Sequence, residues 1–272
     1  MKIFGLIGEK LGHSLSPEIH QSLFGKLDMD AKYNLFSISK ENINMAVSSL
    51  KILGISGVNI TIPYKETLME QVDFISDEAR KIGAINTILV KNNKSYGYNT
   101  DYYGFKKMLL RDGVTFKGRE FYVLGSGGAS KAIIHLLLDE GASKVYMVSR
   151  DKISASEKFK GINMEFLNYE DMNDIKKSYA IINTTPCGMY PNIDSIAVSK
   201  GIFNKFEVAC DIVYNPEETR FLKEAKECGI KTVKGLYMLV AQAIKAEEIW
   251  NNIIIDEKTE KDIFLEISKK FK

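Results

Sequence analysis

Residues 120–130 read EFYVLGSGGAS and join an apolar segment to the start of a helix. The first five residues predict a buried strand, and the helix is expected from Gly127 to Glu140. Without side chains, Gly125 and Gly127 let the backbone turn tightly and approach a pyrophosphate, which the positive end of the helix attracts. Ser130 stands where a third glycine would complete the motif. A glycine turn without a ligand therefore stays open as the alternative to a dinucleotide site.

Strands and helices alternate on both sides of this motif. Before it we expect strands at 2–7, 32–38 and 57–62, helices at 17–27 and 41–53, and two short strands at 85–90 and 95–98 joined by a tight turn at Asn92-Asn93. After it we expect strands at 144–149, 164–167, 180–183 and 208–213 and a long helix at 236–250. This second series is doubly wound, with parallel strands and helices on both faces.

The length of 272 residues supports two domains, at about 150 residues per domain. The order of elements predicts an α/β fold with an N-terminal α/β domain at 1–100, which has a mainly parallel sheet and is completed by C-terminal helices at 236–272. The second domain, at 101–235, is expected to be a Rossmann-like, doubly wound dinucleotide-binding domain.

The composition excludes several classes of protein. With 45% hydrophobic and 26% charged residues, the chain is neither disordered, collagen-like nor a disulfide scaffold. A net charge of +2 gives no electrostatic case for nucleic acid or a membrane surface as partner. Cys187, Cys210 and Cys228 lack C-x-x-C spacing, and the three histidines lack metal-ligand spacing, so no disulfide framework and no metal site are expected. No apolar run is long enough for a membrane span, and we expect a cytoplasmic protein.

The end of the strand at 144–149 bears on which nucleotide binds. An acidic residue there would hold the ribose 2′-hydroxyl, whereas Arg150, with Lys152 nearby, suits the 2′-phosphate of NADP. Two alternatives stay open. Asp151 could neutralise Arg150 or accept a ribose hydroxyl itself, and Arg150 could be an ordinary solvated surface residue.

Polar residues of the N-terminal half form a second group of candidates. Ser16 is the expected N-cap of the first helix, with Pro17 in its first turn. Together with Ser14 it would also seat a small carboxylate or polyol at the positive end of that helix. Capping alone is the alternative for Ser16.

Lys65 and Asp101 are the candidate acid–base pair. Lys65 follows the strand at 57–62, at the edge of a parallel sheet where ligands bind. Asp101 opens a helix and could simply cap it, but a carboxylate beside a lysine would also orient the ammonium group. Asn86 at the start of a strand and Gln242 in an otherwise apolar helix are polar residues that a turn or a domain boundary would also explain.

These residues lie in ordered motifs along which the chain resembles the shikimate/quinate dehydrogenase family, and within it the NADP-linked shikimate dehydrogenases of aromatic amino-acid and chorismate biosynthesis. The resemblance runs from Gly8 to Gln242. Its motifs are 13–17 with His20, 59–65, 83–87, 99–101, the glycine turn at 125–130, 183–189, 211–216, and 235–239 with Gln242.

The resemblance implies a role for each matching residue. Lys65 and Asp101 would be the catalytic pair, and both would also contact the substrate. The other implied substrate-binding residues are Ser14, Ser16, Thr61, Asn86, Tyr214 and Gln242. The implied cofactor-binding residues are Asp77, Gly125, Ser126, Gly127, Gly128, Ala129, Ser130, Ser149, Arg150, Thr184, Ile212, Gly235 and Met238. The first domain would then bind the substrate and the second NADP, with NAD as the alternative cofactor.

The implied reaction is reversible hydride transfer from NADPH to 3-dehydroshikimate, giving shikimate, in a cleft between the two domains. Lys65 would supply a proton to the developing alkoxide and Asp101 would orient Lys65. A quinate/shikimate dehydrogenase that uses NAD and a non-catalytic nucleotide-sensing protein stay open, while Arg150 argues against a methyltransferase. The expected partners are the small-molecule substrate and a second copy of the chain in a homodimer, with no nucleic acid and no membrane.

Overall fold

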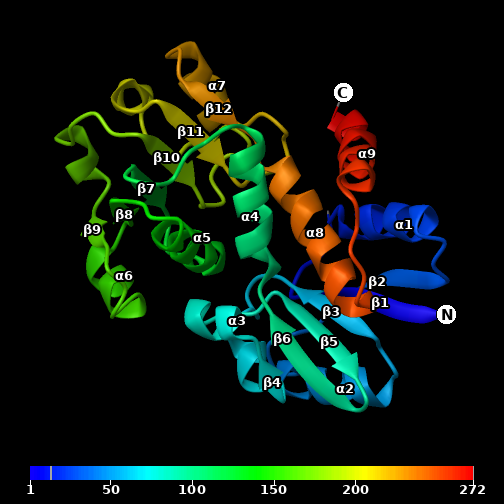
Figure 1. Ribbon diagram of the computed structural model, residues 1–272. Coiled ribbons are helices and arrows are strands. Elements are labelled where there is room, and N and C mark those ends of the chain that lie inside the picture. Colours follow the sequence, from blue (N-terminus) through cyan, green and yellow to red (C-terminus); the bar gives the residue numbers. More distant parts are fainter. Residues whose placement is uncertain (13, 272) are drawn as a thin grey trace. The chain divides into compact units, whose positions relative to one another are not determined.

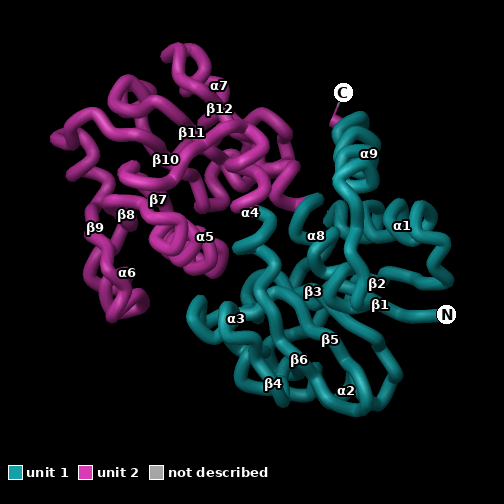
Figure 2. The backbone as a smooth tube through the Cα atoms, in the orientation of Figure 1, with its two compact units in different colours: residues 1–104, 240–270, 272 teal, residues 105–239, 271 magenta. Residues whose placement is uncertain are grey.

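The computed structural model describes residues 1–12 and 14–271 and divides into two compact units. Unit 1 comprises residues 1–104 and 240–270, and unit 2 comprises residues 105–239 and Phe271 (Figure 2). The chain changes units inside two helices, α4 (Thr100–Arg111) and α8 (Leu236–Asn251). Among the described helices none combines the length and the apolar character that crossing a bilayer requires.

Unit 1 is built on a six-stranded sheet in the order β2-β1-β3-β5-β6-β4 (Figure 1). Its strands are β1 (Lys2–Gly8), β2 (Ala31–Ser37), β3 (Gly57–Ile60), β4 (Phe74–Ile75), β5 (Thr87–Lys91) and β6 (Lys94–Tyr98). The pairs β1–β2, β1–β3 and β4–β6 are parallel, and the pairs β3–β5 and β5–β6 are antiparallel. Asn92 and Asn93 have positive φ values of 52° and 59° in the β5–β6 turn, as a tight hairpin turn requires.

Both faces of this sheet are covered. Phe4 and Leu6 of β1 pack with Phe24 and Trp250 on one face, and Ile7 packs with the α2 residues on the other, because successive strand side chains point to opposite faces. The helices are α1 (Ser16–Lys26), η1 (Ile43–Met45), α2 (Ala46–Ile52), η2 (Thr67–Glu70), α3 (Asp77–Ile82) and α9 (Glu257–Ser268), followed by η5 (Lys269–Phe271).

Unit 2 is built on an all-parallel sheet in the order β12-β11-β10-β7-β8-β9. Its strands are β7 (Glu120–Leu124), β8 (Lys144–Val148), β9 (Glu165–Leu167), β10 (Ala180–Asn183), β11 (Val208–Asp211) and β12 (Lys231–Val233). Its helices are α5 (Gly128–Asp139), α6 (Lys152–Lys158), η3 (Glu170–Asn173), η4 (Lys200–Lys205) and α7 (Arg220–Glu227). Strand order reverses between β7 and β10, which confirms the doubly wound prediction and marks the usual ligand edge.

Two predicted strands end two residues earlier than expected. The strand predicted to Ile62 ends at Ile60, because the carbonyl of Thr61 accepts a bond from the Tyr64 amide and turns the chain. The strand predicted to Val213 ends at Asp211, whose carboxylate accepts a bond from the Val213 amide. In both places a local hydrogen bond replaces the pairing with the neighbouring strand, and the chain turns at the carboxyl edge of its sheet.

Candidate active site

Lys65 and Asp101 lie side by side in unit 1. Lys65 is in the turn after β3 and Asp101 is the second residue of α4. The Lys65 Nζ donates to Asp101 Oδ2 at 2.5 Å, and the two side chains are only 14% and 10% exposed. The amide of Asp101 donates to Asn99 Oδ1 at 3.1 Å, so Asn99 serves this end of the helix. The Asp101 carboxylate is directed to Lys65 instead of capping α4.

Asn86 holds the second oxygen of that carboxylate. Its Nδ2 donates to Asp101 Oδ1 at 2.9 Å and to Thr100 Oγ1 at 3.0 Å, and its Oδ1 accepts from the Thr100 amide at 2.7 Å. Asn86 is buried, and these three bonds fix which way its amide points. Both oxygens of Asp101 are therefore positioned by defined partners.

A chain of buried polar residues that the sequence analysis gave no role supports Asn86. Thr87 Oγ1 donates to Asn86 Oδ1 at 3.0 Å, Asn59 Nδ2 donates to Thr87 Oγ1 at 3.0 Å, and Tyr33 OH donates to Asn59 Oδ1 at 2.8 Å. Burial, with the charge of Glu247, raises the pKa of Tyr33 well above its usual value and keeps the phenol a donor. Asn59 interrupts the apolar sequence of β3, and Thr87 is the polar residue that begins β5, which is the signal that could have revealed them.

Ser14 and Ser16 lie at the start of α1. The prediction that Ser16 is the N-cap is wrong: Leu15 occupies that position, and the Ser16 amide donates to Ser14 Oγ at 3.2 Å. The buried Ser16 side chain lies beside the Tyr33 hydroxyl, which donates to Asn59 in the network around Asn86. Ser14 is thus the hydroxyl that serves the helix end.

The remaining predicted residues of this group differ in their placement. Gln242 in α8 accepts a bond from Thr100 Oγ1 at 3.3 Å, so it joins the same network. Thr61 directly follows β3, where its carbonyl accepts the Tyr64 amide. Tyr214 belongs to unit 2, and burial raises its pKa. His13 lies outside the described residues, while His20 packs as a buried residue with its Nδ1 2.5 Å from Glu247 Oε1.

The glycine turn in unit 2 has the geometry that its sequence predicts. Gly125 has a φ of +96°, and an added Cβ would lie 2.8 Å from Thr185 Cγ2, so glycine is required there. A Cβ on Gly127 would meet nothing within 4 Å, which leaves open space beside the turn. Gly127 is the N-cap of α5 without a side-chain hydrogen bond, so the first amides of the helix face that space uncapped. Ser130 Oγ donates to the Gly127 carbonyl at 2.6 Å and braces the turn.

The other predicted cofactor residues of unit 2 follow its strands. Ser149 and Arg150 follow β8, Thr184 follows β10, Ile212 follows β11, and Gly235 lies two residues after β12. The Thr184 hydroxyl donates to the Leu124 carbonyl at 2.7 Å, which ties its loop to the glycine turn. A Cβ on Gly235 would lie 2.5 Å from the Ile212 carbonyl oxygen, so only glycine allows this approach.

Gly128 and Ala129 open α5, and Ser126 lies between the two glycines of the turn. Met238 is buried in α8. Asp77 is the one predicted cofactor residue that belongs to unit 1, where it is exposed at the start of α3.

The residues after β8 settle how Asp151 is used. Asp151 is the N-cap of α6 and its Oδ1 accepts bonds from the amides of Ile153 and Ser154, at 3.1 and 3.0 Å. Lys152 pairs with Asp171 at 3.5 Å. Among the described residues, Asp151 therefore caps α6 and forms no ion pair with Arg150. Within residues 14–271, no hydrogen bond or ion pair holds the exposed Arg150 guanidinium.

Asp211, which was not predicted as a site residue, bonds to the loops that follow β10 and β11. It is fully buried, and it accepts bonds from Asn183 Nδ2 at 3.0 Å, the Val213 amide at 2.9 Å and Thr219 Oγ1 at 2.6 Å. Burial raises the pKa of Asp211 to about 7 although these three bonds favour its charged form. Burial likewise raises the pKa of the neighbouring Cys210 thiol.

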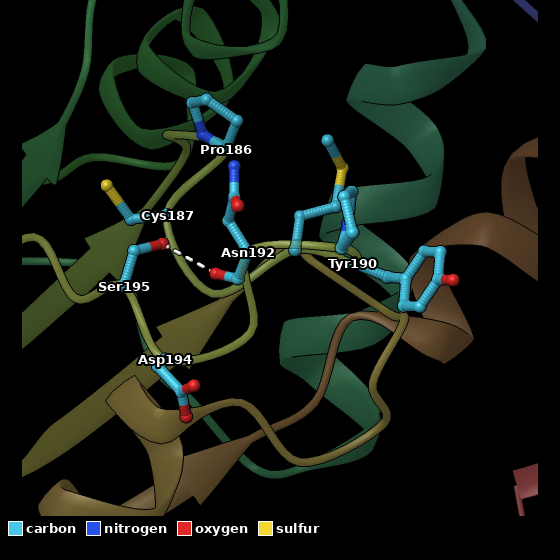
Figure 3. Close-up of a pocket in the computed structure, with 8 residues that line it drawn as sticks. Pro186, Cys187, Tyr190, Asn192, Asp194 and Ser195 are labelled. Atoms are coloured by element: carbon cyan, nitrogen blue, oxygen red, sulfur yellow. Dashed lines mark hydrogen bonds between the residues drawn. The ribbon is translucent and has the colours of Figure 1, made fainter.

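A cavity of about 550 Å³ lies in the loop after β10 (Figure 3). Within it, Ser195 Oγ donates to the Asn192 carbonyl at 2.8 Å. None of the predicted site residues lines this cavity, which is formed by Pro186, Cys187, Met189, Tyr190, Pro191, Asn192, Asp194 and Ser195.

Comparison with known proteins gives one consistent answer. Residues 6–88 match the family model described as "Shikimate dehydrogenase substrate binding domain". The chain is 58% identical over 271 residues to a protein of Clostridium perfringens (strain ATCC 13124) named "Shikimate dehydrogenase (NADP(+))", and the match covers 100% of both chains.

Two solved structures extend the comparison to three dimensions. A chorismate mutase/shikimate 5-dehydrogenase fusion protein from Clostridium acetobutylicum is 45% identical with a TM-score of 0.96, covering 99% of this chain and 98% of that one. Shikimate 5-dehydrogenase from Thermus thermophilus, solved in complex with NADP(H) and shikimate, is 29% identical with a TM-score of 0.86, covering 98% of this chain and 99% of that one.

Proposed function

The chain belongs to the shikimate dehydrogenase family, and on that premise we propose that it catalyses the reversible NADPH-dependent reduction of 3-dehydroshikimate to shikimate in chorismate and aromatic amino-acid biosynthesis. The observation that carries this function is the largely buried Lys65–Asp101 pair, held at 2.5 Å and braced by Asn86. A relative that matches the full chain at 58% identity and is named for NADP(+) supports NADP over NAD.

Unit 1 is the proposed substrate-binding and catalytic domain. Shikimate carries one carboxylate and three hydroxyls, which need several converging polar groups. Ser14 and Ser16 offer hydroxyls at the positive end of α1, and Asn86 and Gln242 are linked through Thr100. The full proposed set of substrate residues is Ser14, Ser16, Thr61, Lys65, Asn86, Asp101, Tyr214 and Gln242.

Lys65 is the proposed proton donor. When bound, NADPH supplies the hydride that adds to the ketone carbon. The Lys65 ammonium gives one proton to the ketone oxygen as negative charge develops there, and the product is a hydroxyl group. The neutral amine of Lys65 then takes up a proton from solvent, and in the reverse direction it accepts the hydroxyl proton.

Asp101 acts by fixing the position of Lys65. Its Oδ2 accepts the Nζ bond while its Oδ1 is held by Asn86, so the ammonium has one defined location before the substrate arrives. Proton transfer in a fixed geometry avoids reorganisation during the reaction, which is a large part of what a positioned acid contributes.

Unit 2 is the proposed NADP-binding domain, and its residues fit the group. Open space beside Gly127 and the uncapped amides of α5 suit a pyrophosphate. Arg150, exposed at the end of β8, suits the 2′-phosphate. The remaining proposed contacts are Ser126, Gly128, Ala129, Ser130, Ser149, Thr184, Ile212, Gly235 and Met238, with Asp77 from unit 1.

A steady-state assay tests the proposed function. The absorbance of reduced nicotinamide is followed while shikimate or quinate is offered with NADP or NAD. The highest kcat/KM is expected for shikimate with NADP. A higher value for quinate with NAD would identify the alternative dehydrogenase, and nucleotide binding without turnover of either acid would identify a nucleotide-sensing protein.

The proposal includes a cytoplasmic location and assembly as a homodimer. Three free cysteines in the described chain, one of them buried, suit a reducing compartment. Light scattering of the purified protein measures the assembly directly, with twice the chain mass expected.

A further inference from the structure

We infer that Lys158, the last residue of α6, binds the 2′-phosphate of NADP(H) together with Arg150 and so determines the preference for NADP over NAD. This inference rests on the proposed function and deepens it. It adds a residue that neither the glycine motif nor the end of β8 identifies.

Lys158 reaches the glycine turn directly. Its Nζ donates to the carbonyl oxygen of Ser126 at 3.1 Å, across 32 positions of sequence. Ser126 lies between Gly125 and Gly127, so this bond places an ammonium group at the turn where the dinucleotide is proposed to bind. The side chain is exposed, and a phosphate can therefore approach it from solvent.

Arg150 follows the strand end that lies next to the same turn. The Gly125 amide donates to the Val148 carbonyl at 2.8 Å, so the glycine turn and the end of β8 are adjacent. Arg150 lies two residues beyond Val148. In doubly wound folds the 2′ position of the adenosine ribose lies at the end of this second strand. A cation before α6 and a cation at its end thus flank the place where the 2′-phosphate is expected.

Two other charged residues of the segment, Asp151 and Lys152, already have partners. Asp151 caps α6 through the amides of Ile153 and Ser154. Lys152, which the sequence analysis placed beside Arg150 as a second cation, pairs with Asp171 instead. Lys158 takes the place that the sequence suggested for Lys152.

The chemistry favours phosphate over the carbonyl of Ser126 as a partner for Lys158. A carbonyl oxygen carries only a partial charge, whereas a phosphate is an anion, so the ammonium gains with phosphate the attraction between two opposite full charges that a carbonyl cannot give. The ammonium can therefore exchange Ser126 for the 2′-phosphate, or bond both, without leaving the turn. NAD offers a hydroxyl at the same position and gains little from the cation.

Calorimetric binding of two nucleotide fragments tests the inference without turnover. Adenosine 2′,5′-bisphosphate carries the 2′-phosphate and adenosine 5′-monophosphate lacks it. The variant Lys158→Gln is expected to weaken binding of the bisphosphate about tenfold and to leave the monophosphate unchanged, since one charge-assisted bond is lost. Lys158→Arg, which keeps the charge, should restore most of the affinity.

Lys152→Gln is the matched control, because it removes the same charge from the same helix. Its affinity for the bisphosphate should remain near that of the unchanged protein. Thermal unfolding of each variant shows that the fold is intact. Equal weakening for both nucleotides in Lys158→Gln would place Lys158 at the pyrophosphate or the turn and overturn the inference, as would no weakening at all.

Failure of the inference and failure of the proposed function give different results. If the unchanged protein binds the bisphosphate no more tightly than the monophosphate, the assignment of NADP itself is wrong. If it prefers the bisphosphate and Lys158→Gln keeps that preference, only the role of Lys158 is wrong.

Discussion

The Lys65 network in unit 1 and the Arg150–Lys158 edge in unit 2 differ in how far the protein itself satisfies their polar groups. In unit 1, Lys65, Asp101, Asn86 and Thr87 are bonded to one another at 2.5 to 3.0 Å in a largely buried setting. At the edge in unit 2, the cations are exposed and the amides of α5 are uncapped.

The difference matches the two tasks. Proton transfer depends on one geometry, which a closed network of hydrogen bonds fixes in advance. Binding a dinucleotide depends on open backbone and accessible charge, and there the ligand supplies partners for the amides of α5. Substitutions in the network should therefore affect turnover and stability together, whereas removal of a cation at the edge should affect nucleotide affinity and little else.

Lys65→Ala should have the largest effect on turnover if the network in unit 1 is catalytic. Loss of a positioned acid lowers kcat by about 10²–10⁴-fold, with a much smaller change in KM for shikimate. Steady-state kinetics in both directions measure the effect. Lys51→Ala is the matched control, since Lys51 also pairs with a carboxylate in unit 1, Asp73, at 2.7 Å. Near-normal turnover of Lys65→Ala would remove the lysine from the mechanism.

Asp211→Asn tests whether the buried Asp211 carboxyl group contributes to the stability of unit 2. The folded pKa of Asp211 is raised to about 7 from the ordinary 3.8. Between those values the folded protein keeps a proton that the unfolded chain releases. The contribution of Asp211 to stability is thus fully present below pH 4 and is lost as pH rises through 7, by about 4 kcal/mol at most.

The measurement is the free energy of unfolding of the unchanged protein and of Asp211→Asn between pH 4 and pH 8. The asparagine cannot titrate, so the difference between the two proteins should change with pH across this window and level off above it. A difference that stays constant over the whole window would show that Asp211 is not the titrating group.

Thr87→Val tests whether the buried hydrogen bonds behind Asn86 contribute to catalysis in unit 1. The substitution keeps the shape of the side chain and removes the hydroxyl that joins Asn59 to Asn86. Leaving buried polar partners unsatisfied should cost about 1–3 kcal/mol of stability. We expect kcat to fall about tenfold, because Asn86 then holds Asp101 less firmly. Thr87→Ser should recover both quantities, whereas a loss of stability with unchanged kcat would make Thr87 purely structural.

Asp151→Ala should have the smallest effect and tests the edge of unit 2. Removal of the N-cap of α6 costs about 1 kcal/mol, seen as a small decrease in Tm. Asp151→Asn keeps a capping side chain and should leave Tm nearly unchanged. Both variants should bind adenosine 2′,5′-bisphosphate at least as tightly as the unchanged protein, since neither removes a bond to Arg150. Clearly weaker binding by both would show that Asp151 contacts the nucleotide.

Local patterns along the chain predicted much of the fold. The strands at 120–124 and 180–183 have the predicted bounds, and the glycine turn lies between β7 and α5 as its motif indicates. The order of elements sufficed for the doubly wound sheet. The short elements β4, α6 and β12 were not predicted, because two to seven residues are too few to show a period.

The site was predictable where a residue type announces its chemistry, and not where partners come from distant parts of the chain. Lys65 and Asp101 were candidates for each other as an acid and a base. The bonds of Thr87 with Asn59 and of Lys158 with Ser126 join residues 28 and 32 positions apart, which no local pattern reports. Asp151 was different, because an aspartate directly before a helix is a capping signal that the sequence already contained.

Because Cys210 is buried in β11, the reactivity of its thiol reports on opening of the sheet in unit 2. Its thiol has no exposed surface, and its raised pKa keeps it in the unreactive protonated form, whereas Cys187 and Cys228 are partly exposed. A thiol reagent should therefore modify two cysteines quickly and the third only when the parallel sheet opens. Counting modified sulfurs by mass over time would measure how often unit 2 opens.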